Sequence, residues 1–201
     1  MDMNRDQAAS LANQVQRSHR LLAGFYKRML PALDDLASTF GTTFWYWGPL
    51  SFDRPCNSST KPSSKWAWDF LPLIAAKFVY IRNDDGNQAA IELQLRIDPS
   101  VLPEARAKKG QPNPTDLPEV TPILRIYLYW LKANSSTDIK SEWDKAEYPA
   151  GEADSTSFLT DDLKGTWLEV PLADFMQASQ ETVALIRNTS VSPPTQLSVD
   201  S

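Results

Sequence analysis

The sequence predicts an α+β fold, in which an antiparallel sheet of about four to five strands packs against helices on one face. Two observations predict it. Apolar residues recur at helical spacing over residues 4–40, and strand signals then follow one another over residues 42–172 without a long helical segment between them. Strands in direct succession form antiparallel meanders and hairpins, whereas parallel strands need crossover helices. With a short helix at residues 174–188, we expect a single domain over residues 1–188.

The N-terminal segment is predicted to be one long helix or two stacked helices. Its apolar residues are spaced by three, four or seven positions, which places them along one stripe. Pro31 removes one helical N–H donor, so we expect a kink or a split near Leu30. Gly41 is the expected end of this segment.

Strand signals occur at residues 42–47, 77–82, 89–98, 123–131 and 167–172. The second and third flank the turn sequence Asn83-Asp84-Asp85-Gly86-Asn87, which predicts a hairpin. Strict alternation over residues 89–98 predicts a sheet with one covered face and one wetter face. Long connections rich in proline or polar residues separate the other strands, and the tail over residues 189–201 is predicted to be disordered.

Charge and cysteine content narrow the functional classes. The net charge is −5, and residues 138–201 carry 4 basic and 12 acidic residues. An acidic surface repels nucleic-acid phosphates and favours a basic partner, although a solvated acidic loop explains the same charge. The single cysteine, Cys56, permits no internal disulfide. With no signal peptide and no apolar run of about 20 residues, we expect a cytoplasmic protein without a membrane partner.

Chemistry-bearing motifs are scarce. One histidine, His19, and one cysteine exclude the usual zinc sites, and no glycine-rich phosphate loop or nucleophile motif occurs. We therefore predict no metal and no cofactor, and we assign no catalytic residue. The sequence favours a non-enzymatic protein without settling the question.

Two pairs of tryptophans form the first candidate binding surface. Trp45 and Trp47 flank Tyr46, and Trp66 and Trp68 flank Ala67. Residues i and i+2 of a strand share a face, so each pair would place two indoles side by side for stacking. The alternative is that these large aromatic side chains close the core.

A polar sheet face forms the second candidate surface. Alternate residues of two predicted strands are polar or aromatic: Glu92, Gln94, Arg96, Arg125, Tyr127 and Tyr129. If the strands are neighbours, a carboxylate, two guanidiniums and two phenols converge, with Glu169 as a further member. Such a face suits a polar or anionic ligand, whereas cross-strand charge pairing on a solvated face is the alternative.

Three functional hypotheses follow. The first is a protein-binding module that recognises a basic partner protein, by analogy with bacterial immunity proteins, antitoxins or phage-encoded inhibitors. The second is a small-molecule binding or enzymatic domain that uses the polar sheet face. The third is an architectural subunit whose N-terminal helix pairs with a second copy of itself. The sequence identifies no partner or ligand.

Overall fold

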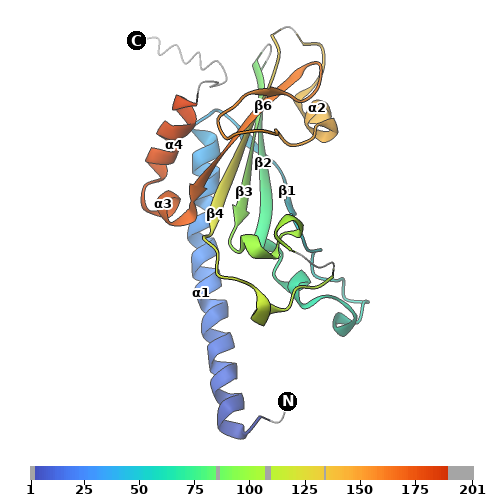
Figure 1. The fold of residues 1–201 in the computed structure, drawn as a ribbon, viewed down its shortest axis with the longest axis vertical. Coiled ribbons are helices and arrows are strands. Elements are labelled where there is room, and N and C mark those ends of the chain that lie inside the picture. The colour runs from blue at the N-terminus through green and yellow to red at the C-terminus, as the bar shows by residue number, and fades with distance from the viewer. Residues whose placement is uncertain (1–2, 85–86, 107–109, 134, 190–201) are drawn as a thin grey trace. The chain divides into compact units, whose positions relative to one another are not determined.

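Figure 1 shows the fold as a computed structural model, which describes residues 3–84, 87–106, 110–133 and 135–189. The chain divides into two compact units, residues 1–35 and residues 36–201. Helix α1 (Arg5–Ser38) fills most of the first unit and continues through Pro31. The predicted split near Leu30 is therefore wrong, because the helix tolerates the loss of the one N–H donor that proline lacks. Gly41 follows in the left-handed region, with φ of 67°, as predicted for a helix end.

The second unit contains a six-stranded antiparallel sheet with the strand order β1-β2-β3-β4-β6-β5. Its strands are β1 (Thr43–Pro49), β2 (Ala75–Asp84), β3 (Asn87–Arg96), β4 (Ile123–Leu131), β5 (Ser157–Phe158) and β6 (Leu163–Pro171). The α+β class and the antiparallel sheet are confirmed. The sheet has one strand more than the upper end of the prediction, because the short β5 pairs with β6.

Three helices accompany the sheet: α2 (Ile139–Lys145), α3 (Leu172–Gln177) and α4 (Ser179–Asn188). The predicted C-terminal helix is thus two helices that meet at Ala178 (Figure 1). Short 3-10 helices lie in the connections: η1 (Pro62–Ser64), η2 (Ala67–Phe70), η3 (Pro72–Ile74), η4 (Pro99–Val101), η5 (Pro103–Ala105) and η6 (Pro114–Asp116). Asp138 begins α2 by accepting hydrogen bonds from the backbone N–H groups of Lys140 and Ser141.

One face of the sheet is apolar and buried. Its central side chains come from β3 and β4, where Leu93, Leu95, Leu124, Ile126 and Leu128 are almost fully buried. Antiparallel pairing aligns these residues directly, for example Leu93 with Ile126. The alternation in the sequence therefore predicts this half of the core correctly.

The opposite face, which we call the polar face, is also buried at its centre. Glu92 is 0% exposed, Gln94 1% and Arg96 7%. The prediction of a wetter second face is wrong here, because α2 contacts four strands of the sheet and the segment after it reaches Glu92 through Tyr148. Ile139 of α2 packs in a cluster with Tyr127 and Tyr129. Glu92, Gln94 and Arg96 at the centre of this face are therefore enclosed by protein rather than by water.

Thr166 of β6 places a hydroxyl in the apolar layer, opposite Leu128. The residue is fully buried, and its Oγ1 has no hydrogen-bond partner among the described residues. We expect Thr166→Val, which keeps the shape and removes the hydroxyl, to raise the free energy of unfolding by about 1 kcal/mol. Urea denaturation measures this change. A lower stability of the variant would show that the hydroxyl has a partner in solution.

Two predictions fall partly outside the described residues. The hairpin of β2 and β3 is present, with Asp84 opposite Asn87, but Asp85 and Gly86 lie outside the described residues. Of the tail over residues 189–201, only Thr189 is described. Within the described chain, no helix has the length and apolar character needed to cross a bilayer.

Candidate functional site

A chain of hydrogen bonds runs along the polar face of β3. Arg96 donates from Nε to Gln94 Oε1 (3.0 Å), and Gln94 donates from Nε2 to Glu92 Oε1 (2.7 Å). Alternate residues of a strand lie about 7 Å apart on one face, so long side chains can bridge them. The two bonds fix the orientation of the Gln94 amide, because its oxygen faces a cation and its nitrogen faces a carboxylate. The three residues therefore form one polar unit.

Glu92 ends this chain as a buried carboxylate held by neutral donors. Besides Gln94, the Tyr148 hydroxyl donates to Oε1 (2.9 Å) and Trp143 Nε1 donates to Oε2 (3.2 Å). A buried carboxylate is costly unless hydrogen bonds compensate for its lost hydration. These donors come from α2 and from the segment that follows it, so Glu92 ties the cover of the polar face to the sheet.

Arg96 ends the chain on the other side. Its Nη1 pairs with Glu104 of η5 (3.2 Å), and its side chain is 8% exposed. Burial lowers the pKa of Arg96, and the positive charge of Arg125 lowers it further. An arginine stays charged at neutral pH even so. Arg96 is thus a fixed cation with little contact to bulk water.

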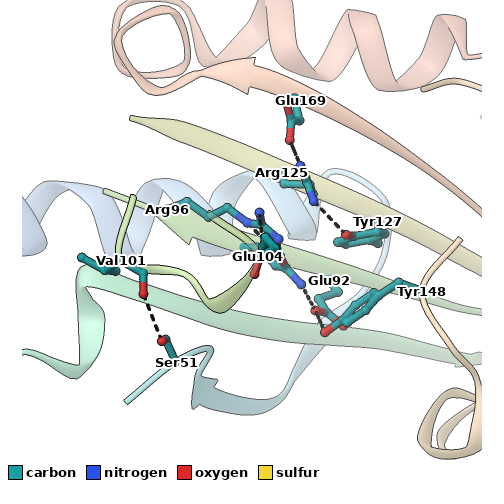
Figure 2. A network of polar contacts seen from close by, with 10 residues as sticks. Ser51, Glu92, Arg96, Val101, Glu104, Arg125, Tyr127, Tyr148 and Glu169 are labelled. Atoms are coloured by element: carbon teal, nitrogen blue, oxygen red, sulfur yellow. Dashed lines mark hydrogen bonds and ion pairs between the residues drawn. The ribbon is translucent and has the colours of Figure 1, made fainter. Parts of the chain in front are cut away.

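Arg125 lies on β4 beside this unit, opposite Gln94 on one side and Glu169 on the other. Figure 2 shows its guanidinium paired with Glu169 and directed to the Tyr127 hydroxyl. Burial favours a lower pKa for Arg125, but hydrogen bonds with Tyr127 and Glu169 outweigh it and raise the pKa. The guanidinium also lies 5.1 Å from the ring centre of Trp167. Arg125 is therefore held in place by three neighbours.

These side chains face a cavity of about 550 Å³, which we call the main cavity. Its floor comes from β2, β3 and β4, and its walls come from the end of β1, from η5 and from the segment at Tyr148. Its polar lining residues are Lys77, Gln94, Arg96, Glu104, Arg125, Tyr127 and Tyr148, and its apolar walls include Leu50, Leu102, Pro103 and Pro149. The two strands are neighbours, and their register brings both arginines to one cavity.

One wall of the main cavity is fixed by local hydrogen bonds. Asp98 accepts from the Ser100 backbone N–H (3.0 Å) and so begins η4, just before Leu102 and Pro103. The Ser51 hydroxyl donates to the Val101 carbonyl (3.3 Å), which joins the loop after β1 to η4 (Figure 2). This wall is therefore held by contacts within the chain itself.

A side cavity of about 160 Å³ adjoins the main one. Lys77 and Tyr148 line both cavities. The other residues that line it are Glu92, Tyr129, Trp143, Asp144 and Ala146. Tyr148, whose hydroxyl is held by Glu92, therefore stands between the two cavities.

Sequence reasoning missed Lys77 and Tyr148 as members of the site. The one sequence signal that could have identified Lys77 is its charge, which interrupts the otherwise apolar start of β2. Tyr148 lies in a polar connection without strand or helix periodicity, so no local pattern placed it near Glu92. Their positions depend on the path of the chain after α2.

Two tyrosines near Glu92 predict a pH dependence of stability. Burial, and then the charge of Glu92, raise the pKa values of Tyr129 and Tyr148 above the ordinary value of 10.0. Their contribution is fully present below about pH 10 and is lost as the pH rises further, because only the unfolded state then releases the protons readily. We expect Tyr148→Phe to weaken the loss of stability above about pH 10 in urea titrations. An unchanged slope would contradict this assignment.

The first tryptophan pair is not arranged as predicted. The register of β1 against β2 shifts between Phe44 and Tyr46, so Trp45 is the extra residue of a bulge. Trp45 contacts Trp143 of α2 (5.3 Å between ring centres), whereas Trp47 pairs with Phe78 on the apolar face. Because the bulge breaks the two-residue period, the two indoles do not lie side by side.

The second pair is also divided. Trp68 lies in η2, is 8% exposed and stacks on Phe52 (5.5 Å between ring centres), while its Nε1 donates to the Pro112 carbonyl (2.8 Å). Trp66 precedes η2 and is 39% exposed. The expectation of a shared strand face is wrong here, since this segment forms a 3-10 helix. Trp68 is therefore a core residue, whereas Trp66 lies on the surface.

The polar-face residues, by contrast, are brought together. Glu92 is opposite Tyr127, and Ala90 is opposite Tyr129, so both phenols share a face with Glu92, Gln94 and Arg96. Arg96, Arg125 and Tyr127 line the main cavity, whereas Glu92 and Tyr129 line the side cavity. Their role in binding stays a prediction, but their convergence follows from the register.

A comparison with family models finds a match over residues 5–189, to the family described as PM0109. The match covers nearly the whole chain, including every strand and helix described above. Neither the search of curated proteins nor the search of solved structures gives a match.

Proposed function

The chain belongs to the PM0109 family, and we propose that it binds a small organic molecule with an acidic group, anchored by Arg96 and Arg125. One observation supports this most: two guanidiniums from neighbouring strands line one cavity of about 550 Å³. The proposal takes up the second of the three hypotheses, a small-molecule site on the polar face.

Both guanidiniums retain hydrogen-bonding capacity. Arg96 uses Nε, Nη1 and Nη2 once each, toward Gln94 and Glu104. Arg125 likewise directs Nε and Nη2 to Glu169 and Nη1 to Tyr127. A guanidinium has five N–H groups, so contacts within the described residues leave two on each unused. Carboxylates and phosphates accept such forked pairs of donors, which supports an acidic ligand group.

The size and walls of the main cavity support a small molecule. Its volume of about 550 Å³ lies within the usual range of ligand pockets, roughly 300–1,000 Å³. Leu50, Leu102 and the Tyr127 ring line it beside the cations. Ligand pockets commonly combine apolar walls with a few fixed polar groups that orient the ligand. An organic body next to an acidic group suits this combination.

The test is a calorimetric titration of the full-length protein with three probes that share one ring: benzoate, phenyl phosphate and benzamide. We expect the two anions to bind and the neutral benzamide to bind at least about tenfold more weakly, because it cannot pair with a guanidinium. Equal binding of all three, or no binding of either anion, would contradict the proposal.

A protein partner stays a second prediction, supported by the acidic excess of residues 138–201. Part of this charge has a local structural role, since Asp138 caps α2 and Glu142 accepts a hydrogen bond from the Thr160 hydroxyl (2.6 Å). The expected cytoplasmic location and a bacterial or phage origin accompany this prediction. Pairing between copies through the N-terminal helix stays a third, separate prediction. A salt-sensitive complex with a basic protein, measured by size-exclusion chromatography at low and high salt, would support it.

A further inference from the structure

Lys77 is an unusual residue for the middle of a sheet. Its neighbours on β2, Ala76 and Phe78, are buried, and Lys77 itself is half-buried on the polar face. Its Nζ lies 4.7 Å from the ring centre of Trp143, and within about 6 Å of those of Tyr46 and Tyr148. Aromatic faces attract an ammonium group and offset part of its lost hydration. The strand therefore presents a fixed positive charge.

Among the described residues, Lys77 has no carboxylate within 4.0 Å of its Nζ. Glu92 lines the same side cavity, but its oxygens already accept from Gln94, Tyr148 and Trp143. Arg96 and Arg125, by comparison, each pair with a glutamate. Lys77 thus differs from both arginines, because no ion pair to it is found among the described residues, although Glu92 and Asp144 line the same side cavity.

The register fixes the backbone spacing of Lys77 and Arg125. Lys77 is opposite Gln94, and Gln94 is opposite Arg125, so the three lie in one row across β2, β3 and β4. With neighbouring strands about 4.8 Å apart, the backbone positions of Lys77 and Arg125 are about 10 Å apart. Between them Gln94 is neutral, and both ends of its amide are already hydrogen-bonded. Lys77 and Arg125 therefore line the main cavity on either side of the neutral Gln94.

We propose that the ligand carries two acidic groups, one bound by Arg96 and Arg125 and the other by Lys77, across the backbone spacing of about 10 Å between Lys77 and Arg125. This inference rests on the proposed function and adds the chemical class of the ligand. Carboxylates and phosphates share the required charge and acceptor geometry. The apolar walls at Leu50 and Leu102 suit an uncharged chain or ring that joins the two groups.

The test is a calorimetric comparison of dianions with monoanions of the same length. Butanedioate, hexanedioate, octanedioate and decanedioate bracket the spacing, and octanoate is the matched monoanion for octanedioate. Hexanediol bisphosphate tests phosphate against carboxylate. We expect the preferred dianion to bind the full-length protein about tenfold more tightly than its monoanion, since a charge-assisted hydrogen bond contributes roughly this factor.

Variants at Lys77 test whether this residue is the second anchor. Lys77→Met is expected to bring the ratio of dianion to monoanion affinity close to one, while Lys77→Arg retains the preference because it retains the charge. Lys164→Met is the matched control, because Lys164 also lies over a ring, 4.7 Å from the centre of Phe158, but does not line the main cavity. It should leave the ratio unchanged.

The outcomes separate the two proposals. If benzoate binds but dianions have no advantage over monoanions, the dianion inference is overturned and the proposed function stands. A dianion preference that survives in Lys77→Met overturns Lys77 as the anchor. If benzoate, phenyl phosphate and all dianions fail to bind, both proposals are overturned together.

Discussion

Replacing Glu92 with alanine is expected to lower the free energy of unfolding by about 3 kcal/mol. The carboxylate is fully buried and accepts hydrogen bonds from Gln94, Tyr148 and Trp143. Its removal leaves these three donors without their acceptor and opens a void beneath Tyr148. Urea denaturation followed by tryptophan fluorescence measures the loss.

Glu169→Ala is the matched control for this experiment. Glu169 is also a glutamate on the polar face, but its side chain is 33% exposed and its partner is the charged Arg125. A partly exposed ion pair contributes at most about 1 kcal/mol, so the control should lose much less stability. If both variants lose the same amount, Glu92 does not hold the cover of the polar face as described.

Replacing Arg96 with methionine is expected to weaken benzoate binding by about 10-fold to 100-fold. The Arg96 side chain is only 8% exposed, so bulk water substitutes poorly for its N–H groups. Methionine keeps much of the volume of the side chain and removes the charge and all donors. Calorimetry of the folded variant, with folding checked by circular dichroism, measures the loss of affinity.

Arg54→Met is the control for a general effect of charge. Arg54 also stacks on a ring, 4.7 Å from the centre of Trp47, and donates to the Trp47 carbonyl, but it does not line the main cavity. Its removal should leave benzoate affinity unchanged. An equal loss in both variants would indicate attraction by the overall charge rather than an anchor at Arg96.

The sequence predicted the sheet well because its strands carry strong local signals. Alternation over β3 and β4 identified the apolar face, and the hairpin signal fixed which residues of β2 and β3 are neighbours. The same alternation placed Arg96, Arg125 and Tyr127 on one face. Convergence of these residues was therefore predictable from a two-residue period and an antiparallel order.

The rest depends on contacts that no local pattern encodes. Polar side chains at alternate positions indicate a solvent-exposed face, yet Glu92 and Gln94 are buried. They are covered by α2 and Tyr148, which come from a part of the chain distant in sequence. The bulge at Trp45 shifts the register by one residue and separates two indoles that the sequence places together. The environment of Lys77 was not predictable either, because the three rings around its ammonium group come from other segments of the chain.

Nitrogen-edited NMR of arginine side chains during a benzoate titration tests whether Arg96 and Arg125 anchor an acidic ligand. Substitution of each arginine by lysine assigns the resonances. We expect the largest shifts at the Nε–H groups of Arg96 and Arg125, while the Arg54 resonance does not move. The largest shifts at the indole N–H groups of Trp47 or Trp66, or no shift at either cavity arginine, would contradict it.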